Sequence, residues 1–75
     1  MKLDEALWQD AGRMSGAVCF RDTRIPVAIL FDYLEVGNLQ EFIRGYPDVT
    51  EDQIRAVIEA SENLIDEHFR AASSL

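Results

Sequence analysis

The apolar segment VAILFDYLEV lies between Pro26 and Gly37, and these two residues predict the start and the end of a helix. Proline fits the first position of a helix, and glycine fits the left-handed residue that follows one. Apolar residues at helical spacing form two faces, one of Val27, Leu30, Phe31 and Leu34 and the other of Ile29, Tyr33 and Val36. A helix that is apolar on two faces has to be buried on both, and the short helices predicted elsewhere cannot easily cover them. We therefore expect a homodimer whose interface contains Ile29, Tyr33 and Val36.

The chain length limits the size of the core. A chain of 75 residues corresponds to one domain, which buries only about 60–65% of its unfolded surface. Because 48% of the residues are hydrophobic, we expect a folded chain whose marginal core is completed by a second subunit or a partner. Residues 1–16 are predicted to be a lead-in segment, residues 17–70 the folded domain, and residues 71–75 a frayed tail.

The composition excludes several kinds of site and location. The single cysteine, Cys19, cannot form an internal disulfide, and no pair of residues has the spacing of zinc ligands. Charged residues within the first twenty positions exclude the apolar core of a signal peptide. No apolar run reaches the roughly 18 residues that a membrane span needs. We expect a soluble, cytoplasmic protein that does not associate with a membrane.

The segment AVCFRDTRI predicts a β-hairpin near the start of the domain. Residues 18–20 have strand propensity, Arg21 and Asp22 suit a turn, and residues 23–25 are expected to return as the second strand. The preceding residues 3–8 allow either one helical turn or a short strand, and the sequence does not decide between them.

Two more helices are predicted after the first. LQEFIRGY forms the second helix with Asn38 as its cap, and YPDV forms the turn that follows. Thr50 and Gln53 have the spacing of a capping box, so the last helix begins at Glu51 and is expected to run to about Phe69. Its second half extends beyond what the two shorter helices can cover. The predicted fold is mainly α, with an N-terminal β-hairpin before a three-helix helix-turn-helix that has a long C-terminal helix.

Four motifs occur in a fixed order over some fifty residues: TRIPV at 23–27, the helix-ending Gly37, YPDVT at 46–50 and QIRAVIEA at 53–60. This arrangement resembles the domain of unknown function 433 family, small bacterial proteins regarded as VapB-like antitoxins. The resemblance implies a homeodomain-like helix-turn-helix. It also implies a partner, because many members are encoded beside a PIN-like ribonuclease toxin that they are thought to neutralise. The family usually has glycine where this chain has Asp22, which weakens any role of the turn backbone in holding a phosphate.

The sequence gives no indication of catalysis. It contains one histidine, His68, and no Ser–His–Asp, Cys–His or paired-carboxylate arrangement is visible. The resembled family supplies no catalytic residues either. We therefore expect no enzyme activity, no cofactor and no bound metal.

Two arginines near the predicted turn and two residues of the last helix are the candidates for DNA contacts. Arg21 and Arg24 either bind a phosphate or a partner carboxylate, or pair within the chain with acids or with helix-end carbonyls. Near the start of the second helix of a helix-turn-helix, Gln53 and Arg55 are side chains able to read adenine and guanine. Binding of operator DNA, as a dimer or in a complex with the toxin, is therefore the alternative function.

The charge distribution favours a basic protein as the partner. The net charge is −7, and residues 50–69 carry six acids against Arg55 alone, a balance of −5. A nucleic-acid binder normally has the opposite sign. We predict that the overhanging half of the last helix binds the toxin, with apolar contact area and flanking acids at Glu62, Leu64, Ile65, Asp66 and Phe69.

Overall fold

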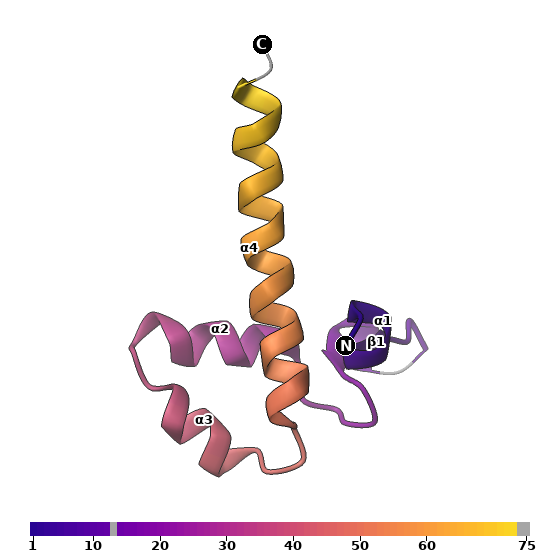
Figure 1. Cartoon of the computed structure of the whole chain (residues 1–75). Helices are drawn as coiled ribbons and strands as arrows, with labels where there is room; N and C mark the ends of the chain where they lie inside the picture. The colour runs from indigo at the N-terminus through magenta and orange to yellow at the C-terminus, as the bar shows by residue number, and fades with distance from the viewer. Residues whose placement is uncertain (13, 74–75) are drawn as a thin grey trace.

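The computed structural model describes residues 1–12 and 14–73, so residues 74–75 of the predicted tail lie outside the described residues. In chain order the elements are α1 (Leu3–Ala6), β1 (Leu7–Gln9), the short 3-10 helix η1 (Met14–Gly16), β2 (Val18–Phe20), α2 (Val27–Glu35), α3 (Leu39–Gly45) and α4 (Glu51–Ser73). Figure 1 shows α2 and α3 on one side of the first half of α4 and the N-terminal elements on the other. The predicted mainly helical fold with an N-terminal hairpin and a long C-terminal helix is confirmed.

The hairpin differs from the prediction in its second strand. β2 pairs with β1 in an antiparallel register that places Trp8 opposite Cys19, so residues 3–8 form first a helical turn and then a strand. The expected strand over residues 23–25 is wrong, because only an isolated bridge joins Cys19 to Pro26. Thr23 uses its N–H and its hydroxyl to bind the carbonyl of Phe20 locally, and proline has no N–H to extend a ladder.

The end of α2 follows the prediction. Gly37 has a φ of +68°, its N–H donates to the Leu34 carbonyl at 3.1 Å, and the Asn38 N–H donates to the Tyr33 carbonyl at 2.9 Å. These two bonds form a Schellman motif, which satisfies carbonyls that a helix end otherwise leaves unpaired. Asn38 then caps α3 by position, although its side chain makes no capping hydrogen bond.

Gly37→Ala is expected to lower the free energy of unfolding by about 1 kcal/mol, because a Cβ is strained at positive φ. Gly45→Ala is the matched control, since its φ is not positive and an added Cβ meets no atom within 4 Å. This second change is expected to raise the free energy of unfolding by roughly 0.5 kcal/mol. Urea titrations followed by circular dichroism measure both, and equal effects at the two glycines would contradict the Schellman end.

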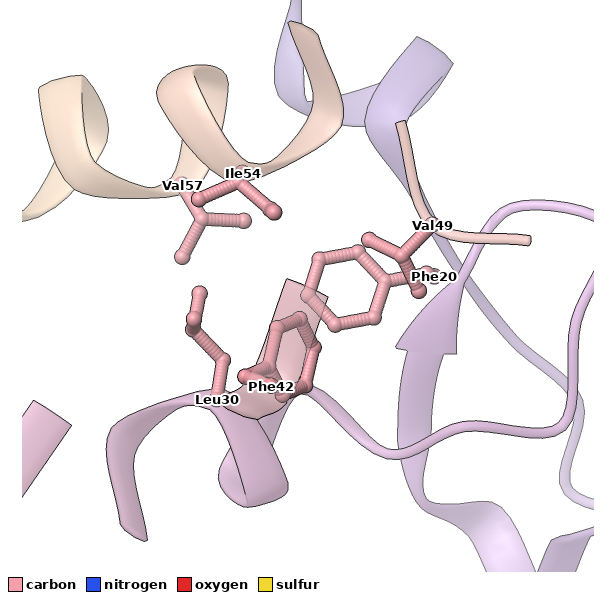
Figure 2. Close-up of a cluster of buried hydrophobic side chains, with 6 residues drawn as sticks. All are labelled: Phe20, Leu30, Phe42, Val49, Ile54 and Val57. Atoms are coloured by element: carbon pink, nitrogen blue, oxygen red, sulfur yellow. The ribbon is translucent and has the colours of Figure 1, made fainter. Parts of the chain in front are cut away.

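One hydrophobic cluster joins β2, all three longer helices and the turn before α4. Its buried members, drawn in Figure 2, are Phe20, Leu30, Phe42, Val49, Ile54 and Val57. The ring centroid of Phe42 lies 6.0 Å from that of Phe20 and 5.1 Å from that of Tyr46. These contacts place an aromatic side chain of α3 at the centre of the core.

The predicted dimer face of α2 is partly used inside the chain. Tyr33 packs edge-on against Phe42, with ring centroids 5.8 Å apart, and Ile29 packs against the same cluster. The expectation that one chain leaves this face uncovered is therefore wrong for these two residues, because α3 covers it. Val36, the third predicted residue, is 75% exposed.

The last helix extends well beyond the core. It runs to Ser73, four residues past the expected end, so part of the predicted tail is helical. Residues 62–72 are all exposed, and Figure 1 shows this half of α4 projecting alone. The Cα radius of gyration is 13.9 Å, compared with about 11 Å for a compact chain of this length. None of the helices in the described residues is long and apolar enough to cross a membrane.

Candidate partner-binding surface

The projecting half of α4 carries large apolar side chains in contact with water. Leu64, Ile65 and Phe69 are 69%, 57% and 65% exposed. The acids Glu62 and Asp66 are exposed on the same half. The structure thus brings the five residues predicted to bind a toxin together on one uncovered helical segment.

Helical phase separates this segment into an apolar stripe and an acidic flank. At about 100° per residue, Ile58, Ile65 and Phe69 fall within an arc of roughly 40°. Glu62 and Asp66 lie on the adjoining arc, so their carboxylates border the stripe on one side. Leu64 lies on the other side of the stripe and faces a hollow of about 430 Å³ whose further lining residues are Met1, Lys2, Leu3, Ala56, Glu59, Ala60, Asn63 and Glu67.

A second concave region lies where α3 meets the start of α4. One hollow of about 370 Å³ is lined by Leu39, Gln40, Ile43, Val49, Glu51 and Ile54. A neighbouring hollow of about 210 Å³ is lined by Leu39, Glu51, Ile54, Arg55, Ile58 and Glu59. Ile43 and Ile58 are 41% and 39% exposed, although each lies at helical spacing from an apolar residue that packs in the core, Leu39 for Ile43 and Ile54 for Ile58. Periodicity identifies an apolar face, but it does not show how much of that face a neighbouring helix covers.

Arg21 contacts the N-terminal segment of its own chain. Its Nη2 donates to the carbonyl oxygens of Asp4 at 2.7 Å and Leu7 at 3.3 Å, at the end of α1. Its guanidinium carbon also lies 5.9 Å from the ring centroid of Trp8. This arrangement agrees with the helix-end alternative considered for the two arginines. Arg24 is exposed and has no hydrogen bond or ion pair within the part of the chain that the structure describes.

Gln53 joins three segments of the chain. Its Oε1 accepts the Thr50 N–H at 2.8 Å while the Thr50 hydroxyl accepts the Gln53 N–H at 3.1 Å, which confirms the predicted capping box. Its Nε2 donates to the carbonyl oxygens of Ala6 at 3.3 Å and Arg21 at 3.2 Å. The side chain is only 6% exposed. This placement corrects the expectation that Gln53 contacts a base, because its amide is turned inward and fully engaged.

The remaining DNA candidate, Arg55, is neutralised on the surface. Its Nη2 lies 2.7 Å from Glu51 Oε1, one helical turn earlier. An exposed pair of this kind contributes only about 0.3–0.5 kcal/mol, yet it places a carboxylate beside the guanidinium. Of the four predicted DNA residues, Gln53 is therefore buried and Arg55 is paired with Glu51. Arg21 donates to backbone carbonyls, and Arg24 is exposed without a partner among the described residues.

The Cys19 side chain is a buried, free thiol in β2. Burial raises the pKa of the Cys19 thiol above its usual range, which keeps it protonated and unreactive at neutral pH. Within residues 1–12 and 14–73, no group of three or more histidine, cysteine or acidic side chains is placed to hold a metal ion.

The sequence comparisons identify a family for this chain. Residues 9–59, more than half of the chain, match the family described as "Protein of unknown function (DUF433)". No curated protein and no solved structure matches the chain. The matched range begins at Gln9, the last residue of β1, and includes β2, α2, α3 and the first part of α4. It contains all six residues of the buried hydrophobic cluster. The chain belongs to the DUF433 family.

Proposed function

We propose that this protein is a cytoplasmic, non-enzymatic interaction module of the antitoxin type, which binds and neutralises a basic PIN-like ribonuclease toxin through the projecting half of α4. The observation that carries this proposal is the uncovered apolar surface of that half, where Ile65 and Phe69 of the stripe and Leu64 beside it are each more than half exposed. Large apolar patches on small domains mark surfaces at which a partner is bound.

The energetics of the projecting helix support a partner. An isolated helix of about 12 residues is marginal in water, because no tertiary packing offsets the conformational entropy that its backbone loses. Burying the exposed parts of Leu64, Ile65 and Phe69 contributes roughly 3–6 kcal/mol before the cost of association is subtracted. A protein that covers this stripe therefore gains affinity and also stabilises the helix.

The charge of α4 supports a basic protein ahead of DNA. Glu51 and Asp52 are exposed at the start of the helix, where a helix-turn-helix protein meets phosphates, and Gln53 is buried there. The alternative function, binding of operator DNA, consequently needs a basic partner in the same complex to offset this repulsion.

Co-expression with the product of the adjacent gene tests the proposal. We expect the two proteins to copurify and the antitoxin-like chain to restore growth that the partner alone inhibits. Purification of the chain by itself, with no effect on growth, would reject the proposed function. Gel shifts at two salt concentrations address the alternative, and tight, salt-sensitive DNA binding by the chain alone would reverse the ranking.

Charge reversal on the acidic flank is expected to weaken partner binding. The double variant Glu62→Lys/Asp66→Lys should raise the dissociation constant at least about tenfold, mainly by slowing association at low salt. The control Asp32→Lys/Glu35→Lys makes the same charge change at exposed positions of α2 and should leave binding nearly unchanged. Surface plasmon resonance at two ionic strengths measures both, and equal losses would attribute the effect to net charge alone.

The homodimer remains part of this proposal and centres on Val36. Val36→Lys is expected to shift a dimer toward the monomer at micromolar concentration, because the exposed apolar side chain is replaced by a charge. Light scattering measures the mass. A monomeric parent protein, or a dimer that the substitution leaves intact, would contradict this interface.

A further inference from the structure

We propose that the partner contributes a basic amphipathic helix that lies along α4 and places one of its apolar side chains in the hollow between α3 and α4. This inference rests on the proposed function and adds the structural class of the bound segment. It also extends the surface to residues of the hollow, such as Ile43 and Ile58, that lie outside the predicted binding segment.

The hollow and the projecting stripe form one continuous apolar track. The two hollows beside α3 share Leu39, Glu51 and Ile54, and Ile58 lines the one nearer the projecting half. Helical phase places Ile54, Ile58, Ile65 and Phe69 within an arc of roughly 60° of α4. The track from Ile54 to Phe69 is about 22 Å long, which corresponds to four turns of a helix lying parallel to it.

The border of this track identifies the charge of its occupant. Glu51, Glu59, Glu62 and Asp66 fall on one adjoining arc of roughly 80° along the whole length of the track. Arg55 lies on that arc too, but it is paired with Glu51. A segment seated on the track therefore meets carboxylates along one side, and lysine or arginine side chains complement them.

The same charges disfavour a second copy of this chain. Each α4 carries six acids, at Glu51, Asp52, Glu59, Glu62, Asp66 and Glu67, against two arginines within the described residues. Two such helices in contact bring like charges together along the interface, which is destabilising. A nucleic acid meets the same repulsion.

The shape of the surface favours a helix over an extended strand. An extended peptide binds by adding to a free sheet edge, whereas α4 satisfies its backbone groups within the helix. The track instead presents ridges of side chains beside a hollow. The side chains of another helix pack into a surface of this shape. An amphipathic helix also offers one apolar stripe with a charged border, matching both parts of the surface.

The probe for this proposal is a synthetic helical peptide of about 16 residues, with leucines on one face and lysines on the other, long enough to span the track. Methyl NMR of the full chain reports on its six isoleucines. We expect shifts at Ile43, Ile58 and Ile65 and none at Ile25 or Ile29, which serve as internal controls. A leucine–glutamate peptide of the same pattern should produce no shifts.

Variants locate the contact. Ile43→Asp is expected to weaken peptide binding at least tenfold, while Phe31→Asp, which changes a similarly exposed apolar residue outside the track, should not. Shifts at Ile25 and Ile29 instead, or equal losses from both variants, would overturn the proposal. Shifts at Ile58 and Ile65 that depend on protein concentration without peptide would assign the track to a second copy and also overturn it, as would displacement of the peptide by duplex DNA.

The same variants separate this inference from the proposed function. If the product of the adjacent gene does not bind the parent chain, the proposed function fails. If that protein binds the parent and Ile43→Asp equally well, the proposed function stands and the docked helix in the α3–α4 hollow is rejected. We expect a loss of at least tenfold for Ile43→Asp in this second assay.

Discussion

Replacing Phe42 with alanine is expected to lower the free energy of unfolding by about 3–5 kcal/mol. Phe42 is fully buried, and its ring contacts those of Phe20, Tyr33 and Tyr46. Truncation removes the apolar burial and leaves a cavity that four surrounding segments cannot easily close. A 75-residue domain has a total stability of only about 4–11 kcal/mol, so the variant should lose a large share of its stability and unfold at a much lower urea concentration.

The neighbouring Ile43→Ala provides the control for Phe42. Ile43 lies on the same helix but is 41% exposed, so its truncation is expected to cost about 1 kcal/mol or less. Urea unfolding followed by circular dichroism compares the two variants. Similar midpoints for both would show that the aromatic cluster is not the centre of the core.

Gln53→Ala is expected to lower the free energy of unfolding by about 2–4 kcal/mol. Loss of the capping box accounts for about 1 kcal/mol. The two hydrogen bonds that Nε2 donates, to the carbonyl oxygens of Ala6 and Arg21, contribute about 0.5–1.5 kcal/mol each, and the Ala6 oxygen still accepts the Arg21 N–H at 2.8 Å when they are lost. The substitution should also loosen the N-terminal segment, because Nε2 of Gln53 donates to the carbonyl of Ala6 in that segment and to the carbonyl of Arg21 after β2. Amide hydrogen exchange of residues 3–9 should accelerate.

Two other substitutions divide the role of Gln53. Thr50→Ala removes only the reciprocal cap and should cost about 1 kcal/mol, with exchange in residues 3–9 little changed. Asn63→Ala removes an exposed amide from the same helix and should stay within about 0.5 kcal/mol of the parent. A loss for Thr50→Ala as large as that for Gln53→Ala would assign the whole effect to the cap.

Local signals in the sequence predicted the parts of the fold that local chemistry determines. Pro26 and Gly37 gave the limits of α2, and the spacing of Thr50 and Gln53 gave the start of α4. The pairing of β1 with β2 was not predictable in this way, because its strands are joined by a long connection and the choice depends on tertiary packing. The residues around Asp22, which follow β2, offered a shorter turn, and Asp22 does adopt a left-handed φ of 64° without building the expected ladder.

The candidate surface was predictable in part. The length of the last helix compared with its neighbours was enough to indicate an uncovered half, which contains Ile65 and Phe69. The hollow beside Ile43 was not predictable, because it depends on the separation between α3 and α4. The inward position of Gln53 was also missed, since nothing local indicates that the carbonyls of Ala6 and Arg21 come within reach of its amide.

Because α4 is long, the packing of its first turn determines where the distant apolar side chains, such as Phe69, lie. The helix is continuous from its capped first turn to Phe69, about 24 Å beyond Gln53, and a partner that stabilises its second half makes it a lever. A tilt of about 5° at Gln53 would move Phe69 by about 2 Å, enough to take an apolar side chain out of register with a docked partner. The residues that fix the angle of this helix, Ala6 and Arg21 among them, therefore govern binding geometry without touching the bound molecule.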